Sequence, residues 1–100
     1  MTLSEEMLFL MDKNKIFSLK KDFILERIDG EITVYHPTLT TAVYLNETGA
    51  LIWELCDGKR TISDIIELLG EQYPESLTQI ETDVKALIGQ LVERSIGELK

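Results

Sequence analysis

The stretch from Tyr44 to Gly58 constrains the fold most, because it encodes the end of a strand, a short helix and both helix boundaries. Asn46 is a favoured helix N-cap, since its side-chain oxygen can accept from an unpaired backbone N–H of the first turn. Glu47 then places a carboxylate at the positive end of the helix dipole. Gly58 ends the helix, because glycine adopts the left-handed conformation without steric cost. We therefore expect a strand that leads directly into a short helix.

This short helix cannot be stable alone. Its broad apolar side carries four large side chains: Leu51, Ile52, Trp53 and Leu55. An isolated helix of this length is marginal in water, so the other elements must pack around it. We expect Trp53 to lie in the core. Cys56, the single cysteine of the chain, is expected to fill buried space and not to serve as a nucleophile or ligand.

A β-hairpin is predicted upstream, where Asp29-Gly30 separates two β-rich segments. Asp-Gly suits the two-residue type I′ turn, in which both turn positions need positive φ. Such a turn fixes the register and sets Ile28 opposite Glu31 and Leu25 opposite Val34. One face of the hairpin then collects apolar side chains that can pack against helices: Phe23, Leu25, Ile32 and Val34. His36, beside Pro37, is expected to be a turn residue.

A third strand is predicted over residues 40–45, which are rich in Thr, Val and Tyr. It follows the loop at Pro37-Thr38 and ends at the cap of the short helix. Together with the hairpin it would form a three-stranded antiparallel sheet. This third strand has a partner on one side only, so its other edge is expected to be open.

A second helix is predicted over about residues 63–72, with an apolar side rich in Ile and Leu. Thr61 or Ser63 can cap its start, and Pro74 lies just beyond its end. A third helix is predicted over about residues 78–94. Its apolar positions recur at helical spacing: Ile80, Val84, Leu87, Ile88 and Leu91.

The start of the third helix has the pattern of a capping box. Thr78 would be the cap, and Glu81 follows three residues later. In such a box the Thr hydroxyl and the Glu carboxylate each accept from a backbone N–H of the first turn. We therefore expect Thr78 and Glu81 to fix the helix boundary.

Three strands followed by three short helices predict an α+β fold with winged helix-turn-helix-like architecture. The 100 residues are enough for one domain, which we assign to residues 16–97. Residues 98–100 are expected to be a tail. Residues 1–15 are expected to be an N-terminal arm or short helix, because Ser4 to Met11 fit a helix capped by Ser4 and a disordered or exchanged apolar arm equally well.

The winged-helix shape suggests DNA binding, but the charge argues against it. The formal net charge is −8, and the second predicted helix carries Asp64, Glu67 and Glu71 without a basic residue. Phosphate would repel such a surface, so we expect no nucleic-acid partner. No apolar run approaches the ~20 residues that span a bilayer, and the acidic start does not resemble a signal peptide. We therefore expect a cytoplasmic protein without a membrane partner.

The sequence also lacks the usual signatures of catalysis. It has no glycine-rich phosphate loop, no CxxC pair, no paired histidines and no plausible Ser/His/Asp set. Its carboxylates are spread over predicted helix faces, where a solvated surface would place them. We therefore expect a binding protein or adaptor, with no enzymatic activity, no metal and no cofactor.

The run YLNETGALIWELCDGKRTISDII at residues 44–66 resembles the pattern of the pyrroloquinoline quinone biosynthesis protein D (PqqD) family. Downstream positions continue the pattern: Tyr73, Ile80, Asp83-Val84, Leu87, Leu91 and Arg94. The resemblance covers Ile16 to Arg94. It departs at both ends, since the first dozen residues are extra and the family's usual Arg-Gly is replaced here by residues 94–97.

The resemblance implies a recognition element for ribosomally made, post-translationally modified peptides (RiPPs). Such a domain binds the leader segment of a precursor peptide and presents it to a modifying enzyme, often a radical S-adenosylmethionine protein. The open third strand suits this role, because a peptide can add to an exposed edge as a further strand. We expect the peptide to contact two sets of residues: Thr41, Ala42, Val43, Tyr44 and Leu45 on the strand, and Asp83, Ala86, Leu87, Gln90, Leu91 and Arg94 on the third helix.

Helical geometry alone does not decide which margin of the third helix faces the strand. One margin carries Asp83, Ala86, Gln90 and Arg94, and the other carries Glu81, Lys85, Ile88 and Val92. We favour the first margin. The alternative function is a winged-helix assembly module, in which the apolar arm and the open strand make a homodimer and bind no peptide.

Overall fold

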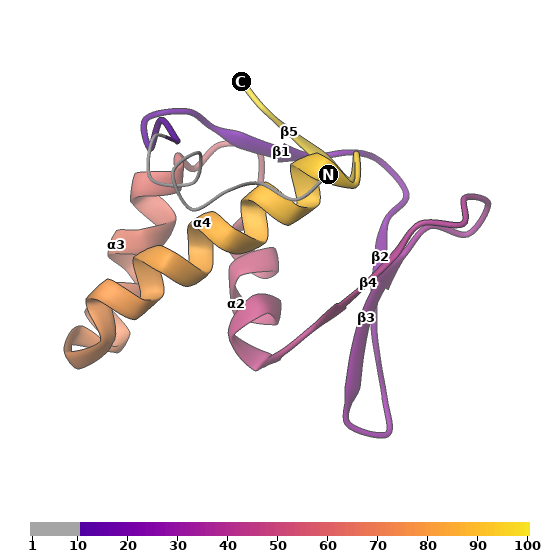
Figure 1. The fold of residues 1–100 in the computed structure, drawn as a ribbon, viewed down its shortest axis with the longest axis horizontal. Helices are drawn as coiled ribbons and strands as arrows, with labels where there is room; N and C mark the ends of the chain where they lie inside the picture. The colour runs from indigo at the N-terminus through magenta and orange to yellow at the C-terminus, as the bar shows by residue number, and fades with distance from the viewer. Residues whose placement is uncertain (1–10) are drawn as a thin grey trace.

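The computed structural model describes residues 11–100, so most of the predicted N-terminal arm or helix lies outside the described residues. Within these described residues, two small sheets and three α-helices make up the fold (Figure 1). The element bounds, in chain order, are β1 Phe17–Leu19, β2 Ile24–Ile28, β3 Glu31–Tyr35, β4 Ala42–Leu45, α2 Glu47–Leu55, α3 Ile62–Gln72, a 3₁₀ turn at Pro74–Ser76, α4 Leu77–Glu93 and β5 Gly97–Leu99. The predicted α+β architecture is confirmed.

Strands β2, β3 and β4 form an antiparallel sheet in that order, and Figure 1 shows it projecting from the helices as a wing. The predicted hairpin register is confirmed, with Ile28 opposite Glu31 and Leu25 opposite Val34. Asp29 has φ 51° and Gly30 has φ 82°, the left-handed values that a type I′ turn requires.

The third strand starts later than expected, at Ala42 instead of Thr40. Its pairing with β3 stops at Ala42 opposite Tyr35, because β3 itself ends there. The chain then turns at His36, whose Nδ1 accepts from the backbone N–H of Thr38 at 3.1 Å. The prediction of His36 as a turn residue is thereby confirmed.

Helix α2 begins after the predicted cap Asn46 and ends at Leu55, with Cys56 as its C-cap, so Gly58 lies two residues beyond the cap and not directly after it. The Asn46 side chain accepts from the Gly49 N–H at 2.7 Å, and Gly58 adopts φ 78° after the helix. Ile52 is fully buried, whereas Trp53 is only half-buried at the edge of the core. The expectation of a core tryptophan is therefore too strong, because Trp53 packs against the core cluster while part of its surface stays exposed.

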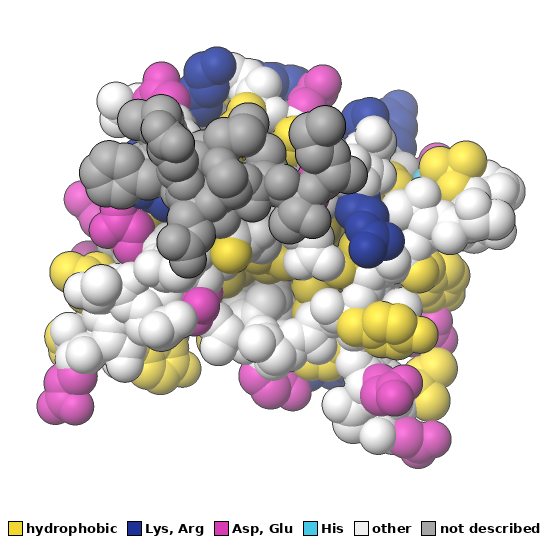
Figure 2. All heavy atoms as spheres, viewed as in Figure 1, with side chains coloured by type: hydrophobic (Ala, Val, Ile, Leu, Met, Phe, Trp, Pro, Cys, Tyr) yellow, Lys and Arg dark blue, Asp and Glu magenta, His cyan; other side chains and the backbone are white. Residues whose placement is uncertain are grey.

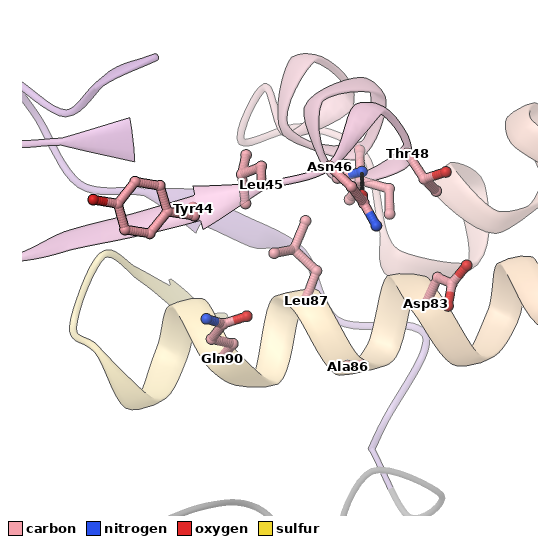
Figure 3. Close-up of a pocket in the computed structure, with 10 residues that line it drawn as sticks. Tyr44, Leu45, Asn46, Thr48, Asp83, Ala86, Leu87 and Gln90 are labelled. Carbon is pink, nitrogen blue, oxygen red and sulfur yellow. Dashed lines mark hydrogen bonds between the residues drawn. The ribbon is translucent and has the colours of Figure 1, made fainter. Parts of the chain in front are cut away.

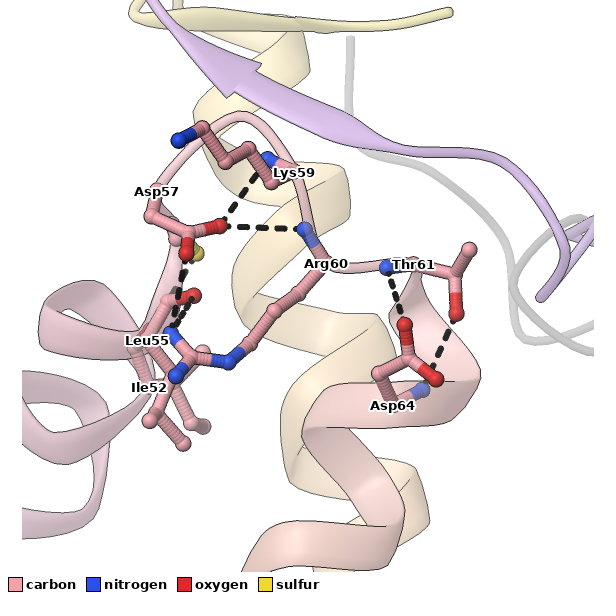
Figure 4. Close-up of polar contacts among 8 residues, drawn as sticks. Ile52, Leu55, Asp57, Lys59, Arg60, Thr61 and Asp64 are labelled. Carbon is pink, nitrogen blue, oxygen red and sulfur yellow. Dashed lines mark hydrogen bonds and ion pairs between the residues drawn. The ribbon is translucent and has the colours of Figure 1, made fainter.

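The turn after α2 is held by polar contacts (Figure 4). Asp57 accepts from the backbone N–H groups of Lys59 and Arg60, and these bonds lower the pKa of its carboxyl. The Arg60 guanidinium donates to the Leu55 carbonyl at 3.3 Å, near the helix end. Thr61 then caps α3 in a complete capping box with Asp64.

Helix α4 corrects one prediction. It begins at Leu77, after the 3₁₀ turn, and its cap Ser76 makes no side-chain hydrogen bond. Thr78 therefore lies inside the first turn and cannot act as the cap. Glu81 instead accepts from Lys13 at 3.0 Å and pairs with Lys85 at 3.3 Å. The predicted capping box is wrong, whereas the apolar stripe of this helix is buried as expected.

A second sheet was not predicted. Strand β1 pairs with β5, which contains two of the three residues expected to form a tail. Ile16 forms a bridge with Thr61, and Ile62 donates its N–H to the Lys15 carbonyl, so the segment before β1 is bound to the start of α3. Phe17 of β1 is fully buried in the same core as the three helices.

Candidate functional site

Among residues 11–100 no strand pairs with the outer edge of β4, and the backbone groups at this free edge can be assigned residue by residue. In a two-residue hairpin the residues that flank the turn exchange both backbone hydrogen bonds, and hydrogen-bonded pairs then alternate. Residues 31, 33 and 35 of β3 therefore face β2, and residues 32 and 34 face β4. Their partners on β4 are Leu45 and Val43. The backbone groups of Ala42 and Tyr44 consequently point away from the sheet, toward its open edge.

A groove of about 210 Å³ lies beside this edge, between β4 and α4 (Figure 3). Figure 3 shows β4 running along α4, with Leu87 rising from the helix toward Leu45. Six of the predicted site residues line the groove: Tyr44, Leu45, Asp83, Ala86, Leu87 and Gln90. Figure 2 shows hydrophobic side chains in the same region, where the wing meets the helices.

The groove answers which margin of α4 faces the strand. Asp83, Ala86 and Gln90 line it, as favoured from the sequence. On the opposite margin Ile88 is fully buried and Lys85 is almost so, within contacts that include Glu81. The helix therefore presents its small and polar margin to the open edge of β4.

The remaining predicted site residues are placed differently. Val43 and Leu91 are buried in the core, with 3% and 0% of their surfaces exposed. Thr41 and Ala42 lie just before the groove. Arg94 is exposed at the end of α4, and its Nη1 donates to the Ala42 carbonyl at 3.5 Å. This contact independently places an Ala42 backbone group at the open edge.

Four lining residues were not predicted: Asn46, Thr48, Gly49 and Ile52. All belong to the cap and first turns of α2. They reach the groove because α2 starts immediately after β4 and so closes one end of it. A Cβ at Gly49 would lie 3.2 Å from Asn46 Oδ1 and 3.3 Å from Leu45 Cβ, which makes this junction tight. Their signal was the strand-to-helix junction itself.

Polar groups mark the two ends of the groove. Asp83 lies near Thr48 at the α2 end (Figure 3), and it accepts from Gln79 Nε2 at 2.8 Å. Arg94 lies at the other end, beside Ala42. Between them the lining is formed largely by Leu45, Leu87 and Ala86. An extended peptide would therefore meet backbone groups of β4 on one side and, on the other, a helix face that combines apolar Ala86 and Leu87 with polar Asp83 and Gln90.

The groove contains no histidine or cysteine among its lining residues. Within residues 11–100 no group of three or more His, Cys, Asp or Glu side chains is placed to hold a metal ion. Cys56 lies buried and donates to the Ile52 carbonyl at 3.1 Å. Burial, with a smaller effect of Asp57, raises the pKa of its thiol to about 12. The prediction of a space-filling cysteine is confirmed.

None of the helices in this part of the chain is long and apolar enough to cross a membrane.

Known proteins are similar to this chain in sequence and in fold. A PqqA binding protein of Klebsiella pneumoniae is 53% identical over 32 residues, which are 32% of this chain and 35% of that protein. A PqqA binding protein of Acinetobacter baylyi is 29% identical over 85% of this chain and 83% of its own length. The chain thus spans about a third of the length of the Klebsiella relative that it matches.

A solved structure, TbiB1 in complex with the TbiA(beta) leader peptide, matches with a TM-score of 0.65 at 20% identity. The match covers 81% of this chain and 94% of the other, and it establishes a shared fold. The sequence family described as coenzyme PQQ synthesis protein D (PqqD) matches residues 9–96. The resemblance noted in the sequence is therefore confirmed, and the chain belongs to the PqqD family.

Proposed function

We propose that this protein binds the leader segment of a ribosomally made precursor peptide and presents it to a modifying enzyme, such as a radical S-adenosylmethionine protein. The peptide adds to the wing sheet as a fourth strand beside β4. It lies in the groove between β4 and α4, and the protein itself performs no chemistry on it.

The observation that carries this proposal is the open edge of β4 above a preformed groove. The outward backbone groups of Ala42 and Tyr44 can pair with an incoming strand, as in other cases of β-augmentation. Tyr44 is 73% exposed, so its side chain points to solvent and leaves the backbone edge of β4 accessible to a peptide. An unused edge of this kind would favour aggregation, and a peptide strand satisfies it.

The groove gives the added strand a preferred pattern. Successive side chains of a strand point to opposite faces, so alternate peptide residues face α4 and the others face solvent. Leu45 and Leu87 face each other across the groove (Figure 3). Ala86, whose side chain is small, also lines the groove and leaves space for a peptide side chain. We expect apolar side chains of moderate size at the inward peptide positions and tolerance at the outward ones.

The names of the relatives support the proposal. The proteins of Klebsiella and Acinetobacter are named for binding PqqA, and TbiB1 was solved with a leader peptide. The proposal that a modifying enzyme is a partner rests on the family resemblance alone.

Proline substitutions test the proposal at the edge. Proline removes a backbone donor, which is tolerated on an edge but not where the donor pairs within a sheet. Tyr44→Pro should keep the fold by circular dichroism and lower the affinity for the leader of the neighbouring precursor peptide more than tenfold. Tyr44→Ala, the matched control, keeps the N–H and should weaken binding only by about threefold. Val43→Pro removes a donor that faces β3 and should unfold the wing.

Two results would contradict the proposal. In one, a folded Tyr44→Pro variant binds the leader peptide as tightly as the parent. In the other, the parent does not bind the peptide and sediments as a dimer that Tyr44→Pro dissociates. The second result would assign the open edge to self-association, the alternative function.

A further inference from the structure

A second cavity, of about 310 Å³, lies where α2, α3 and α4 come together beyond the groove. Its apolar lining comes from Leu51, Leu69, Tyr73 and Ile80. Leu69 and Ile80 are buried, whereas Tyr73 is 49% exposed at the mouth. Leu51, Leu69 and Ile80 are expected from the sequence only to pack in the core, yet a cavity remains between them.

The cavity continues the groove. Thr48 and Asp83 line both of them. Along α4 the groove is lined at Gln90, Leu87 and Asp83, and the cavity takes over at Asp83 and Ile80. These positions follow each other at helical spacing, so one stripe of α4 forms the floor of both.

The Gln79–Asp83 hydrogen bond lies where the groove meets the cavity, since Asp83 lines both and Gln79 lines the cavity. Asp83 can accept further hydrogen bonds, because each carboxylate oxygen has more than one lone-pair site. A peptide backbone N–H that passes this point therefore finds an acceptor. The passage suits an extended chain whose next apolar side chain enters the cavity.

We infer that this cavity is an anchoring subsite for one aliphatic or aromatic side chain of the same leader peptide, an inference that rests on the proposed function. The wing sheet is antiparallel throughout, and an added antiparallel strand runs opposite to β4. Its N-terminal side then points toward Thr48 and Asp83, and the anchor residue precedes the strand-forming segment.

The spacing of the anchor follows from helix and strand dimensions. Leu87 and Ile80 are separated by about 10 Å along α4, at 1.5 Å per residue. An extended peptide covers this distance in about three residues, at about 3.3 Å each. The anchor is therefore placed about three residues before the segment that pairs with Ala42 and Tyr44.

The experiment fills the cavity with a side chain of the protein. Ser76 lines the cavity and is an α4 cap without a side-chain hydrogen bond, so Ser76→Trp removes no capping contact. Thr78→Trp is the matched control, because Thr78 is exposed nearby and does not line the cavity. Both variants are checked for folding by circular dichroism and melting temperature.

The probe is a synthetic leader of the precursor peptide encoded beside the gene of this protein. It is titrated in three forms: full-length, truncated at the N-terminus, and truncated at the C-terminus. Ser76→Trp should weaken the full-length leader at least about tenfold, the scale of one buried side chain, and Thr78→Trp less than twofold. A leader truncated before the strand-forming segment should bind parent and Ser76→Trp equally. In the parent, alanine at the anchor position should weaken binding by the same factor, and this arm needs no folded variant.

The outcomes separate the two proposals. If the full-length leader binds, loses affinity with Tyr44→Pro, and is unaffected by Ser76→Trp and by alanine at every N-terminal position, the subsite is wrong and strand addition stands. If the C-terminal truncation removes the sensitivity to Ser76→Trp, the peptide direction is wrong. If no leader form binds the parent protein, the proposed function itself fails.

Discussion

The two small sheets of this protein are both antiparallel, but they have opposite roles in the fold. The β1–β5 sheet joins residues from the two ends of the described chain and buries Phe17 within the helical core. The wing sheet is local in sequence, projects from the helices and, within the described part of the chain, leaves β4 with one free edge (Figure 1). The first sheet closes the domain, and the second keeps its edge free for another strand. Stability and binding should therefore separate between them.

The largest expected effect is in the closed sheet. Phe17→Ala removes a fully buried aromatic side chain and leaves a cavity. Such truncations cost about 3–5 kcal/mol of the free energy of unfolding, a large share for a domain of this size. Chemical denaturation measures this loss. A Phe17→Ala variant as stable as the parent would show that the β1–β5 sheet does not close the core.

A smaller loss is expected from Gly97→Ala in β5. A Cβ at this position would collide with the Phe17 ring and lie 2.9 Å from the Ser18 carbonyl oxygen, so β1 and β5 must separate. Overpacking of this kind costs about 1–3 kcal/mol. The folded fraction should still bind the leader peptide with parental affinity. A selective loss of affinity without loss of stability would break the separation between the two sheets.

Acid should loosen the closed region further. The side chains of Lys13 and Lys85 lower the pKa of Glu81, which ties the segment before β1 to α4. A carboxyl with a lowered folded-state pKa stabilises the fold above its ordinary value of 4.5, and this contribution is lost as the pH falls through the lowered pKa. The melting temperature should therefore drop below pH 4.5, and less steeply for Glu81→Gln. Equal slopes for parent and variant would exclude this contribution.

The smallest effect is expected where the wing meets α2. Arg27 Nη1 lies 2.9 and 3.0 Å from the two carboxylate oxygens of Glu47, but both side chains are well exposed. Exposed ion pairs contribute about 0–1 kcal/mol. A double-mutant cycle with Arg27→Ala and Glu47→Gln measures the coupling. A coupling above about 2 kcal/mol would mean that the wing is fixed much more firmly than its exposed position suggests.

The same contrast explains what the sequence could predict. The wing is encoded locally, since Asp29-Gly30 specifies the turn and the turn sets the register. Helix α2 is likewise specified by Asn46 and Gly58. The β1–β5 sheet pairs three-residue strands from distant parts of the chain, and no periodic pattern is visible in segments so short.

The candidate site was also predicted only in part, because some of its features are set by local sequence and others by tertiary packing. Helical spacing placed Asp83, Ala86 and Gln90 on one margin, but only tertiary packing decides that this margin faces β4. Val43 and Leu91 share the predicted segments yet point into the core. Thr48 was missed, because nothing in a helix cap indicates that it also closes the end of a groove.

Backbone hydrogen exchange tests the central claim most directly, because the proposed contacts are backbone contacts. In the free protein the N–H of Val43, which faces β3, should exchange slowly, whereas the N–H of Tyr44 should exchange rapidly at the open edge. Saturation with the leader peptide should protect Ala42 and Tyr44 at least about tenfold and leave Val43 unchanged. Bound peptide without added protection at Ala42 and Tyr44 would contradict strand addition to β4.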